Sequence, residues 1–427
     1  MMLATRTFFS AKNAAPAALA LRALSSSSWG QVPQGPPDAI LGLVEAFNAD
    51  SFPKKVSLSV GAYRDDQGKP YVLDTVKEAE RRNLDADMNK EYAGIVGVQG
   101  YVDKAIEFAY GSESVPLQEN RVAAVQTLSG TGACRLAGDF FSRFGVGAAG
   151  AIHQPNPTWG NHIPIFKDAG MDVRQYRYFD KSTNGLDFSG LLADIHAADD
   201  GSLFLLHACA HNPTGVDPTL EQWKELSELM KQKNHTAFFD CAYQGFASGD
   251  ANRDAAALRH FVAEGHNIVL AQSFAKNFGL YGERVGALSV VCESEEEKDR
   301  VLSQLKILIR PMYSNPPVNG ARIVQTILED PALEAQWRDE CKGMADRIID
   351  MRELLKSNLE AAGSSLSWNH ITDQIGMFCY TGLSKEQVQA LREDHHIYLT
   401  GDGRVSMAGV NKNNVDYIAQ AVHAVTK

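Results

Sequence analysis

The sequence predicts an α/β protein in which a large αβα domain, built on a mainly parallel sheet, carries a smaller α+β domain. Its 427 residues exceed what a single hydrophobic core usually holds. The middle of the chain alternates strand-like apolar runs with helical patterns, which indicates parallel strands joined by helices. The last third has helical patterns around one short strand. We therefore expect segments 38–70 and 344–427 to form the small domain and 71–343 the large one.

The expected elements follow from the spacing of apolar residues. Strands of the large domain are predicted at 122–128, 148–153, 203–210, 236–240, 268–272 and 287–292. The helix after the first of these has apolar residues at helical spacing from Ala133 to Phe144. The last third predicts helices over 344–362, 385–395 and about 414–425, and a strand over 374–380. The segment 38–65 is expected to pack with this last third.

The composition favours a globular protein that binds neither nucleic acid nor membranes. Apolar residues make up 44% of the chain and charged residues 22%, which is ordinary for a globular domain. No run approaches the roughly 20 apolar residues that span a bilayer. The net charge of -11, without a basic stripe, argues against a nucleic-acid partner.

The first residues differ in character from the rest. Residues 1–37 contain no Asp or Glu, but they include Arg6, Lys12, Arg22 and a serine run at 25–28. An acid-free leader rich in Ser, Ala and Arg is typical of an organelle transit peptide, which we place at residues 1–28. A disordered tail is the alternative.

No metal site and no disulfide framework is expected. The six cysteines form no CxxC pair, and most lie in apolar runs, which favours buried reduced thiols. His207 and His211 are four residues apart, but their segment is predicted to be a strand, where this spacing does not form the helical metal pair.

Lys276 is the central candidate for chemistry. It follows the predicted strand 268–272, and ligands of open α/β sheets are held where strands end. Burial and a cationic neighbour both lower the pKa of a lysine. Arg284 lies eight residues on, among glycines that let the backbone approach a ligand. A nucleophilic amine with an arginine suited to phosphate is what a Schiff-base site for pyridoxal phosphate needs. A surface lysine in a glycine-rich loop is the alternative.

A second motif, Ser129-Gly130-Thr131-Gly132, joins a predicted strand to a predicted helix. The free N–H groups and partial positive charge of a helix N-terminus favour a phosphate there. A glycine-rich turn that caps the helix is the alternative. A dinucleotide site is disfavoured because the third glycine of GxGxxG is missing.

Further polar residues also follow predicted strands. Asp240 ends one strand, where a carboxylate could keep a pyridine nitrogen protonated, and Tyr243 could bond a ring hydroxyl. Asn212, at the end of another strand, could reach the same hydroxyl. Trp159 could stack on an aromatic ring and His162 could bond a buried aspartate. Taken singly, each could equally be a cap, a turn or a core residue.

Two arginines suggest a dicarboxylic substrate. Arg310 lies in a proline-rich segment, 309–317, that predicts a rigid loop, and Arg404 lies in an otherwise apolar strand. Arginines in such settings need a carboxylate or phosphate partner. Ser273 and Lys276 also match the SxxK of serine acyl enzymes, but the SDN and KTG elements of those enzymes are missing.

From about Trp29 to its C-terminus the chain resembles the class I pyridoxal-phosphate-dependent aminotransferases, and within them the aspartate aminotransferases of the mitochondrial type. The resemblance implies the type I fold of pyridoxal-phosphate-dependent transferases and a homodimer with shared active sites. It also implies reversible ping-pong transamination of L-aspartate and 2-oxoglutarate to oxaloacetate and L-glutamate. The leader then directs the chain to the mitochondrial matrix, with a plastid as the less favoured address.

The resemblance also implies a role for each candidate residue. Lys276 forms the Schiff base and acts as general base, Asp240 pairs with the pyridinium nitrogen, and His162 lies behind it. Tyr243 and Asn212 hold the ring hydroxyl, and Trp159 stacks on the ring. The implied phosphate ligands are Ser129, Gly130, Thr131, Ser273 and Arg284, with Tyr92 of the neighbouring subunit. Arg404, beside Gly61, takes the substrate α-carboxylate, and Arg310 of the other subunit takes the distal one.

The sequence departs from the family pattern at Tyr92-Ala93-Gly94-Ile95, where the family usually reads Tyr-Leu-Pro-Ile. Without the proline this loop is less restricted. The nearest rival function is an aromatic amino-acid aminotransferase of the same fold, which Arg310 disfavours because an apolar side chain would leave that charge unpaired. Two rivals from different classes are a non-catalytic binding protein and an NAD-dependent dehydrogenase.

Overall fold

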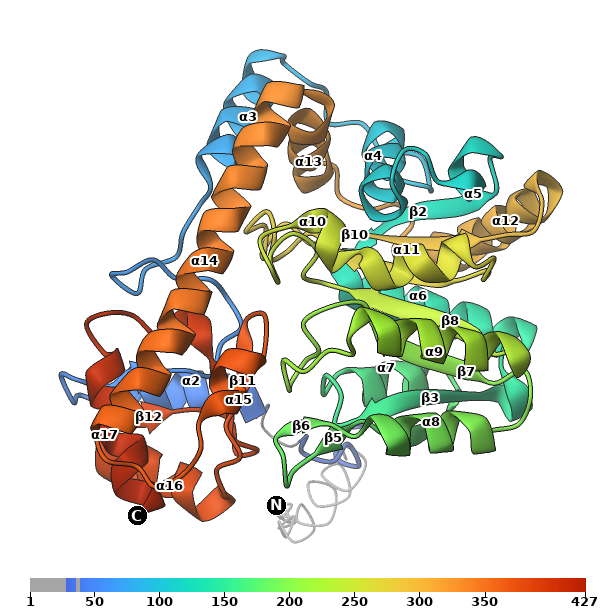
Figure 1. Cartoon of the computed structure of the whole chain (residues 1–427). Coiled ribbons are helices and arrows are strands. Elements are labelled where there is room, and N and C mark those ends of the chain that lie inside the picture. Colours follow the sequence, from blue (N-terminus) through green and yellow to red (C-terminus); the bar gives the residue numbers. More distant parts are fainter. Residues whose placement is uncertain (1–27, 36–38) are drawn as a thin grey trace, which may run out of the picture.

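The computed structural model describes residues 28–35 and 39–427, so the predicted transit peptide lies outside the described residues except for Ser28. A seven-stranded sheet forms the centre of the larger part (Figure 1), in the order β2-β10-β9-β8-β7-β3-β4. Its strands are β2 (Val122–Leu128), β3 (Ala151–Asn156), β4 (Asp172–Arg177), β7 (Leu203–His207), β8 (Thr236–Cys241), β9 (Val269–Ser273) and β10 (Val285–Val291). Every neighbouring pair is parallel except the two that contain β10. The predicted mainly parallel sheet is therefore confirmed.

Of the seven-stranded sheet, the sequence missed one strand, β4, which lies at its edge. Its residues, Asp-Val-Arg-Gln-Tyr-Arg, are mostly exposed, so it lacks the apolar run that marked the other strands. Several predicted strand boundaries were also wrong, and the strand predicted over 374–380 begins only at Phe378. β7 ends at His207 rather than at residue 210, because Ala210 adopts a left-handed conformation (φ 50°) outside the sheet. β3 begins at Ala151 rather than at residue 148, after a short 3₁₀ turn.

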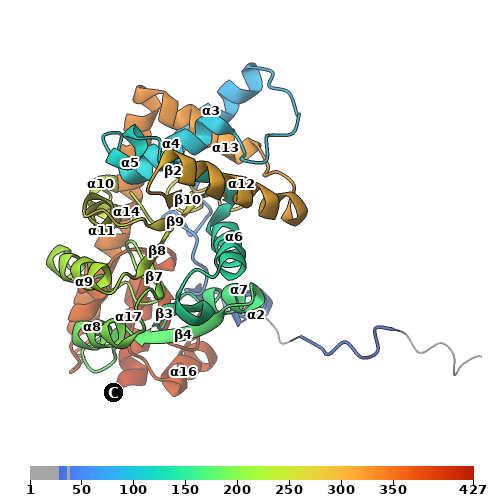
Figure 2. The same cartoon turned by 90° about the vertical axis from the view of Figure 1, so that its right-hand side faces the viewer.

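Helices cover both faces of the sheet (Figure 2). One face is covered by α6 (Ser129–Phe144), α7 (His162–Asp168) and α12 (Glu295–Met312); the other by α4 (Gln99–Tyr110), α8 (Phe188–Ala197), α9 (Leu220–Gln232) and α11 (Ala256–Ala263). Neighbouring aromatic residues of β8 therefore pack against helices on opposite faces of the sheet. Phe238 packs against Phe141 of α6, with ring centroids 5.3 Å apart, whereas its neighbour Phe239 packs against Phe261 of α11 at 5.1 Å. Because successive strand residues point to opposite faces, β8 is buried on both.

The helix α14 (Pro331–Ala361) runs along the molecule and joins its two parts (Figure 1). At one end it packs near α3 (Asp74–Asp85) and α13 (Asn319–Glu329), and at the other near α15 (Asn369–Asp373) and α17 (Val415–Thr426). The predicted start of this helix at 344 was wrong by thirteen residues. The sequence does mark the observed start of the helix. Asp330 caps it by accepting hydrogen bonds from Ala332 N and Leu333 N, and Pro331 occupies the first helical position.

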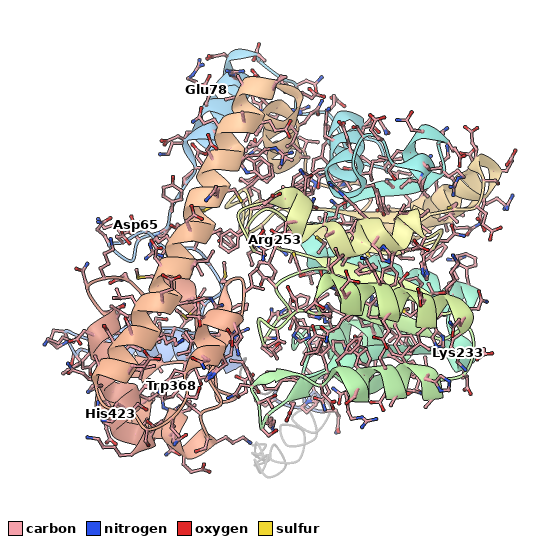
Figure 3. The ribbon with its side chains drawn as sticks, in the orientation of Figure 1. Asp65, Glu78, Lys233, Arg253, Trp368 and His423 are labelled. Carbon is pink, nitrogen blue, oxygen red and sulfur yellow. The ribbon has the colours of Figure 1, made fainter. Side chains whose placement is uncertain are left out.

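The C-terminal third forms a compact α+β unit with the segment that precedes the large sheet. β1 (Val56–Ser57) pairs in parallel with β12 (Ile397–Tyr398), and β11 (Phe378–Tyr380) pairs antiparallel with β13 (Arg404–Ser406). Arg347 of α14 donates to the Asp66 carboxylate at 2.8 Å and to the Val410 carbonyl at 3.1 Å. Figure 3 labels Asp65 on the loop beside α14 and Trp368 within the C-terminal part. The exact domain boundaries stay a prediction.

The remaining elements are α2 (Ala39–Ala49), α5 (Val115–Gln118), α10 (Ala251–Asp254), α16 (Lys385–His395) and the β5 (Phe179–Asp180)–β6 (Gly185–Leu186) hairpin. All six cysteines are buried and unpaired, as predicted. Within the described ranges, none of the helices combines the length and the apolar character needed to cross a bilayer.

Candidate active site

The carboxyl ends of the parallel strands meet at one edge of the sheet and surround a cavity of about 220 Å³. Because β10 is antiparallel, its first residue lies at this same edge, which brings Arg284 to the strand ends. The cavity is lined by Ser129, Gly130, Thr131, Trp159, His207, Cys209, Asn212, Asp240, Ala242, Tyr243, Ser273, Ala275, Lys276 and Arg284. Most of the residues singled out in the sequence therefore converge on one cavity, as ligand sites at strand ends do.

One end of the cavity offers hydrogen-bond donors for an anion. The helix α6 begins at Ser129 with no side chain capping its first N–H groups. The Ser129 and Ser273 hydroxyls lie 2.9 Å apart, and Ser129 N donates to the Arg284 carbonyl at 3.1 Å. A Cβ at Gly130 would lie 3.2 Å from the Ser273 Cβ, so a side chain there would narrow the space between these groups. Free helix N–H groups, two hydroxyls and a guanidinium suit a phosphate.

Lys276 lines the same cavity. Burial lowers the pKa of its amine to about 8, with the positive charges of Arg284 and Arg404 adding to the effect and Asp240 opposing it. The residues that follow it are fixed to α14. Phe278 stacks on Trp337 with ring centroids 4.3 Å apart, and Trp337 Nε1 donates to the Asn277 carbonyl at 2.9 Å. The amine is therefore held by a rigid segment and is partly neutral near physiological pH.

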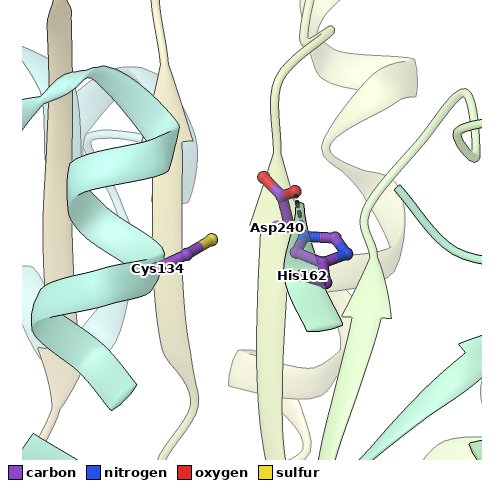
Figure 4. Close-up of side chains that lie close together, drawn as sticks. All are labelled: Cys134, His162 and Asp240. Atoms are coloured by element: carbon purple, nitrogen blue, oxygen red, sulfur yellow. Dashed lines mark hydrogen bonds and ion pairs between the residues drawn. The ribbon is translucent and has the colours of Figure 1, made fainter. Parts of the chain in front are cut away.

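Asp240 is supported from behind by a histidine (Figure 4). His162 Nε2 donates to Asp240 Oδ2 at 3.0 Å, and the His162 side chain is completely buried. Burial by itself would raise the pKa of the Asp240 carboxyl, but the His162 hydrogen bond and the nearby Lys276 bring it below its ordinary value. Asp240 is thus kept as a carboxylate that faces the cavity.

The histidine behind Asp240 belongs to a longer chain of hydrogen bonds. The Asn212 N–H donates to His207 Nδ1 at 3.2 Å, which leaves His207 Nε2 to donate to Thr158 Oγ1 at 3.2 Å. The Thr158 hydroxyl then donates to His162 Nδ1 at 2.8 Å, and His162 Nε2 donates to Asp240. Burial lowers the pKa of His207 to about 3, so this histidine stays neutral. A single direction of donation therefore runs from the Asn212 backbone to the carboxylate.

Cys134, His162 and Asp240 bring three potential metal ligands within 4.8 Å of one another (Figure 4). Burial and the Asp240 charge raise the pKa of the Cys134 thiol well above its ordinary value. A metal would need the thiolate, and the His162 Nε2 that faces the carboxylate already donates to it. The cluster is therefore better explained as a support for Asp240 than as a metal centre.

The other walls of the cavity carry the aromatic and amide groups. Trp159 meets His162 edge to face, with ring centroids 5.1 Å apart, and lines the cavity with its half-buried indole. Burial raises the pKa of the Tyr243 phenol, so it remains a hydrogen-bond donor at neutral pH. Asn212 lines the cavity as well, and its Oδ1 accepts from Arg404 Nη1 at 3.4 Å.

Arg404 reaches the same region from β13 of the C-terminal part. It is buried, its guanidinium lies 4.1 Å from the centroid of Phe378, and Nη2 donates to the Ser59 carbonyl at 3.1 Å. Its Nε is buried and has no hydrogen-bond partner among the described residues. A Cβ at Gly61 would lie 2.6 Å from Phe378, which explains the glycine there. A buried guanidinium with an unused donor suits a carboxylate ligand.

Two candidate residues do not reach the cavity of their own chain. Tyr92 is 86% exposed on the loop after α3. Arg310 is also exposed, and it donates to Ser314 Oγ. The predicted proline-rich loop around Arg310 was wrong, since α12 continues to Met312 and includes Pro311. Burial of Leu305 and Ile309 against the sheet stabilises this last turn although Pro311 lacks an N–H.

Sequence reasoning missed several residues of the site. His207 was considered only as a metal ligand, and Thr158 and Phe378 were not singled out. Ser59, which contacts Arg404, was also missed. Polar residues next to an identified motif could have suggested Thr158, since it precedes Trp159 directly. No local signal marks Phe378 or Ser59, because their roles depend on a residue far along the chain.

The residues present fit pyridoxal phosphate. The donor set at the start of α6 suits its phosphate, the Asp240 carboxylate suits its ring nitrogen, and the Trp159 face suits its ring. The partly neutral amine of Lys276 suits its aldehyde.

Comparisons with known proteins find relatives over nearly the whole chain. The family model for aminotransferase class I and II matches residues 53–422. The chain is similar to the mitochondrial aspartate aminotransferase of Dictyostelium discoideum, with 57% identity over 399 residues and 93% of each chain covered. Among solved structures it resembles a mitochondrial aspartate aminotransferase from Trypanosoma brucei (TM-score 0.87, 46% identity, covering 90% of this chain and 100% of that one). It also resembles an aromatic-amino-acid aminotransferase from Burkholderia pseudomallei covalently bound to pyridoxal phosphate (TM-score 0.91, 42% identity, covering 94% and 100%).

Proposed function

The chain belongs to the class I and II aminotransferase family, and from that premise we propose that it is an aspartate aminotransferase. The reaction is the reversible transfer of an amino group between L-aspartate and 2-oxoglutarate, which gives oxaloacetate and L-glutamate. The observation that carries the proposal is that Lys276 and Asp240 line one cavity, while the buried Arg404 contacts Asn212 in the wall of the same cavity. The names of the Dictyostelium discoideum and Trypanosoma brucei relatives support aspartate as substrate.

When bound, pyridoxal phosphate supplies an aldehyde that takes up the amino group and a ring that accepts electrons from the substrate Cα. We assign its phosphate to Ser129, Gly130, Thr131, Ser273 and Arg284. Asp240, supported by His162, would keep the ring nitrogen protonated. Tyr243 and Asn212 would donate to the ring hydroxyl, and Trp159 would cover one face of the ring.

Lys276 moves the proton. Its amine, with a pKa of about 8, can take a proton from the substrate Cα and deliver it to the aldehyde carbon of the cofactor, on the other side of the amino nitrogen. Asp240 and Tyr243 complete the catalytic set, because each holds a charge or proton at a fixed position on the ring. The chain alternates between two half-reactions at this one site, as ping-pong chemistry requires.

Arg404 determines where the amino acid lies. Its unused Nε is a donor for the α-carboxylate, with Gly61, Trp159 and Asn212 alongside. We assign the distal carboxylate to Arg310 and a phosphate contact to Tyr92, both from the second subunit of a homodimer. An aromatic amino-acid aminotransferase is the second candidate, supported by the similarity to the Burkholderia pseudomallei enzyme. Arg310 favours the dicarboxylic substrate.

We place the enzyme in the mitochondrial matrix, with residues 1–28 as its transit peptide. The acid-free leader and the mitochondrial relatives support this address. A fusion of these residues to a fluorescent reporter should enter mitochondria, and a plastid or cytosolic reporter would contradict the assignment.

Covalent labelling tests the function. The protein, incubated with pyridoxal phosphate and reduced with borohydride, should carry the pyridoxyl label on Lys276 in peptide mapping. Lys276→Ala should lose this label, and its turnover of aspartate should fall by several orders of magnitude, because both the attachment point and the base are gone. Lys233→Ala is the matched control, since Lys233 pairs with Asp200 far from the cavity (Figure 3). A label on another lysine would contradict the mechanism.

A further inference from the structure

The amine of Lys276 has an aromatic neighbour outside the set assigned above. Its Nζ lies 5.0 Å from the centroid of the Tyr281 ring. Among the described residues the amine makes no hydrogen bond. A ring face at this distance attracts an ammonium group, because the aromatic quadrupole is negative above the ring, but it gives a neutral amine no such stabilisation.

Hydrogen bonds to its hydroxyl and to its backbone carbonyl hold Tyr281 in place. Its hydroxyl accepts the Tyr63 N–H at 2.8 Å, and its carbonyl accepts from Arg284 Nη1 at 3.0 Å. Tyr63 is itself buried, and its ring packs edge to face against Tyr71 and Phe246, with centroids 5.7 and 6.3 Å apart. The backbone of a segment 218 residues away therefore fixes the position of the ring that faces Lys276.

The charged groups around Lys276 have opposing effects on the protonation of its amine. Arg284 and Arg404 disfavour its charged form, and Asp240 favours it. Burial, the largest effect, also disfavours the charge and lowers the pKa of the amine to about 8. The face of the Tyr281 ring also stabilises the ammonium, although the ring itself carries no net charge. It therefore acts without repelling the phosphate or the substrate carboxylates.

We propose that Tyr281 stabilises the ammonium that forms when Lys276 takes a proton from the substrate, and that the bond from Tyr63 N–H to its hydroxyl keeps the ring in position for this. The proposal rests on the function proposed above for Lys276 as base. Because the ring interacts with the protonated amine more strongly than with the neutral one, its effect is greater after proton transfer than before. Tyr281 then contributes to turnover more than to substrate binding.

Three replacements at Tyr281 distinguish the effect of its ring from the effect of its hydroxyl. Tyr281→Leu removes both, and Tyr281→Phe removes only the hydroxyl. Replacing Tyr281 with pentafluorophenylalanine keeps the shape of a phenyl ring but reverses the charge of its face. The matched control is Tyr71→Leu, which removes another tyrosine of the same aromatic group that does not face Lys276.

The first measurement uses the full chain stripped of cofactor. The rate at which a small acylating reagent modifies Lys276 is followed against pH by peptide mass spectrometry, with the cofactor-loaded protein as the protected control. In Tyr281→Leu and in the fluorinated variant, the pH at which the acylation rate of Lys276 is half-maximal should fall by about one unit. Tyr281→Phe should shift this midpoint less, because the ring remains but loses the bond from Tyr63 N–H that positions it, and Tyr71→Leu should leave it near the wild-type value. In the loaded enzyme, kcat should fall about tenfold for the first two variants, with a smaller change in KM.

Several outcomes would overturn the proposal. An unchanged midpoint in Tyr281→Leu or in the fluorinated variant would exclude the ring contact. An equal shift in Tyr281→Phe would assign the effect to the hydroxyl instead of the ring. The fluorinated variant keeps the test decisive if the leucine variant unfolds, as thermal melting would reveal. Failure of the proposed function appears separately, as the absence of a pyridoxyl label on Lys276 in the wild-type chain.

Discussion

Asp217 shows how a single carboxylate can position a residue of the site without touching the cavity. Its Oδ2 accepts the Ala210 N–H at 2.6 Å and its Oδ1 accepts the His211 N–H at 2.9 Å. These are the two residues before Asn212, and Ala210 has the left-handed conformation that a side chain usually avoids. The carboxylate therefore stabilises the turn that presents Asn212 to the cavity.

The stability of Asp217→Asn relative to wild type should depend on pH. Burial raises the pKa of Asp217 to about 6 from its ordinary value of 3.8, although the His211 and Ala210 N–H groups oppose the rise. Between these values the folded state keeps a proton that the unfolded chain releases. The contribution of this carboxyl to the unfolding free energy therefore falls as pH rises through the window, by no more than about 3 kcal/mol.

Asp217→Asn has no carboxyl that titrates at this position. The amount by which its unfolding free energy lies below that of the wild type should therefore be larger near pH 4.5 than near pH 7. Denaturant unfolding of both proteins at the two pH values measures the difference. A deficit that stays constant, or that grows toward pH 7, would show that the Asp217 proton is not linked to folding in this way.

At the scale of elements, the antiparallel strand β10 fixes the start of α6. Gly286 of β10 faces the turn that begins this helix, and a Cβ there would lie 2.5 Å from the Ser129 carbonyl carbon and 2.6 Å from Gln272 O. Both contacts are with backbone, which cannot rotate away as a side chain could. The sheet and the phosphate-binding end of the cavity are therefore packed as one unit.

Gly286→Ala should push α6 away from β10. We expect the unfolding free energy to fall by about 1–3 kcal/mol through overpacking. The affinity for pyridoxal phosphate should fall with it, because Ser129 moves from the other phosphate donors. Denaturant unfolding and a fluorescence titration with the cofactor measure the two effects. Gly282→Ala is the control, since a Cβ at Gly282 meets nothing within 4 Å; equal losses in both variants would refute the packing argument.

At the scale of the whole molecule, two of the residues that we assign to the site lie outside the cavity of their own chain. Tyr92 and Arg310 are exposed outside the cavity, and large apolar side chains are exposed on the same elements. These side chains are Leu84, Met88, Ile307 and Met312. A second copy of the chain that covers them would bury apolar surface and bring both polar residues to a neighbouring site, which supports the proposed dimer.

Mixed dimers test this arrangement. Arg310→Ala and Lys276→Ala chains should each be nearly inactive with aspartate, because Arg310→Ala loses a bidentate pair worth about 1.5–3 kcal/mol per hydrogen bond. In a dimer of one with the other, one site receives both defects and its twin receives neither. Purified mixed dimers should therefore regain up to half of the wild-type activity.

Lys276→Ala mixed with Arg404→Ala is the matched control. Both of these residues serve the cavity of their own chain, so each site of the mixed dimer keeps one defect and no activity should return. Verified mixed dimers of the Arg310 and Lys276 variants that stay inactive would mean that Arg310 acts in its own chain, or not at all.

The sequence by itself determined the local features of the fold and the site. Apolar runs in the middle of the chain predicted the strands of the large sheet except β4, whose exposed residues give no such signal. Polar residues directly after those runs predicted most of the cavity lining, because parallel strands bring their carboxyl ends to one edge. The helix over 385–395 was predicted with its observed bounds, and in the structure Ser384 and Gln387 form a capping box at its start.

Only the tertiary structure decided which distant residues meet. The bond between Tyr63 and Tyr281 spans 218 positions, and the contact between Asn212 and Arg404 spans 192. The extension of α12 through Pro311 likewise depends on packing of Leu305 and Ile309 against another element. A local pattern reports the preference of a segment for helix or strand and the face that it buries. It cannot report where the chain returns, and that return places the Tyr281 ring and the Arg404 charge near Lys276.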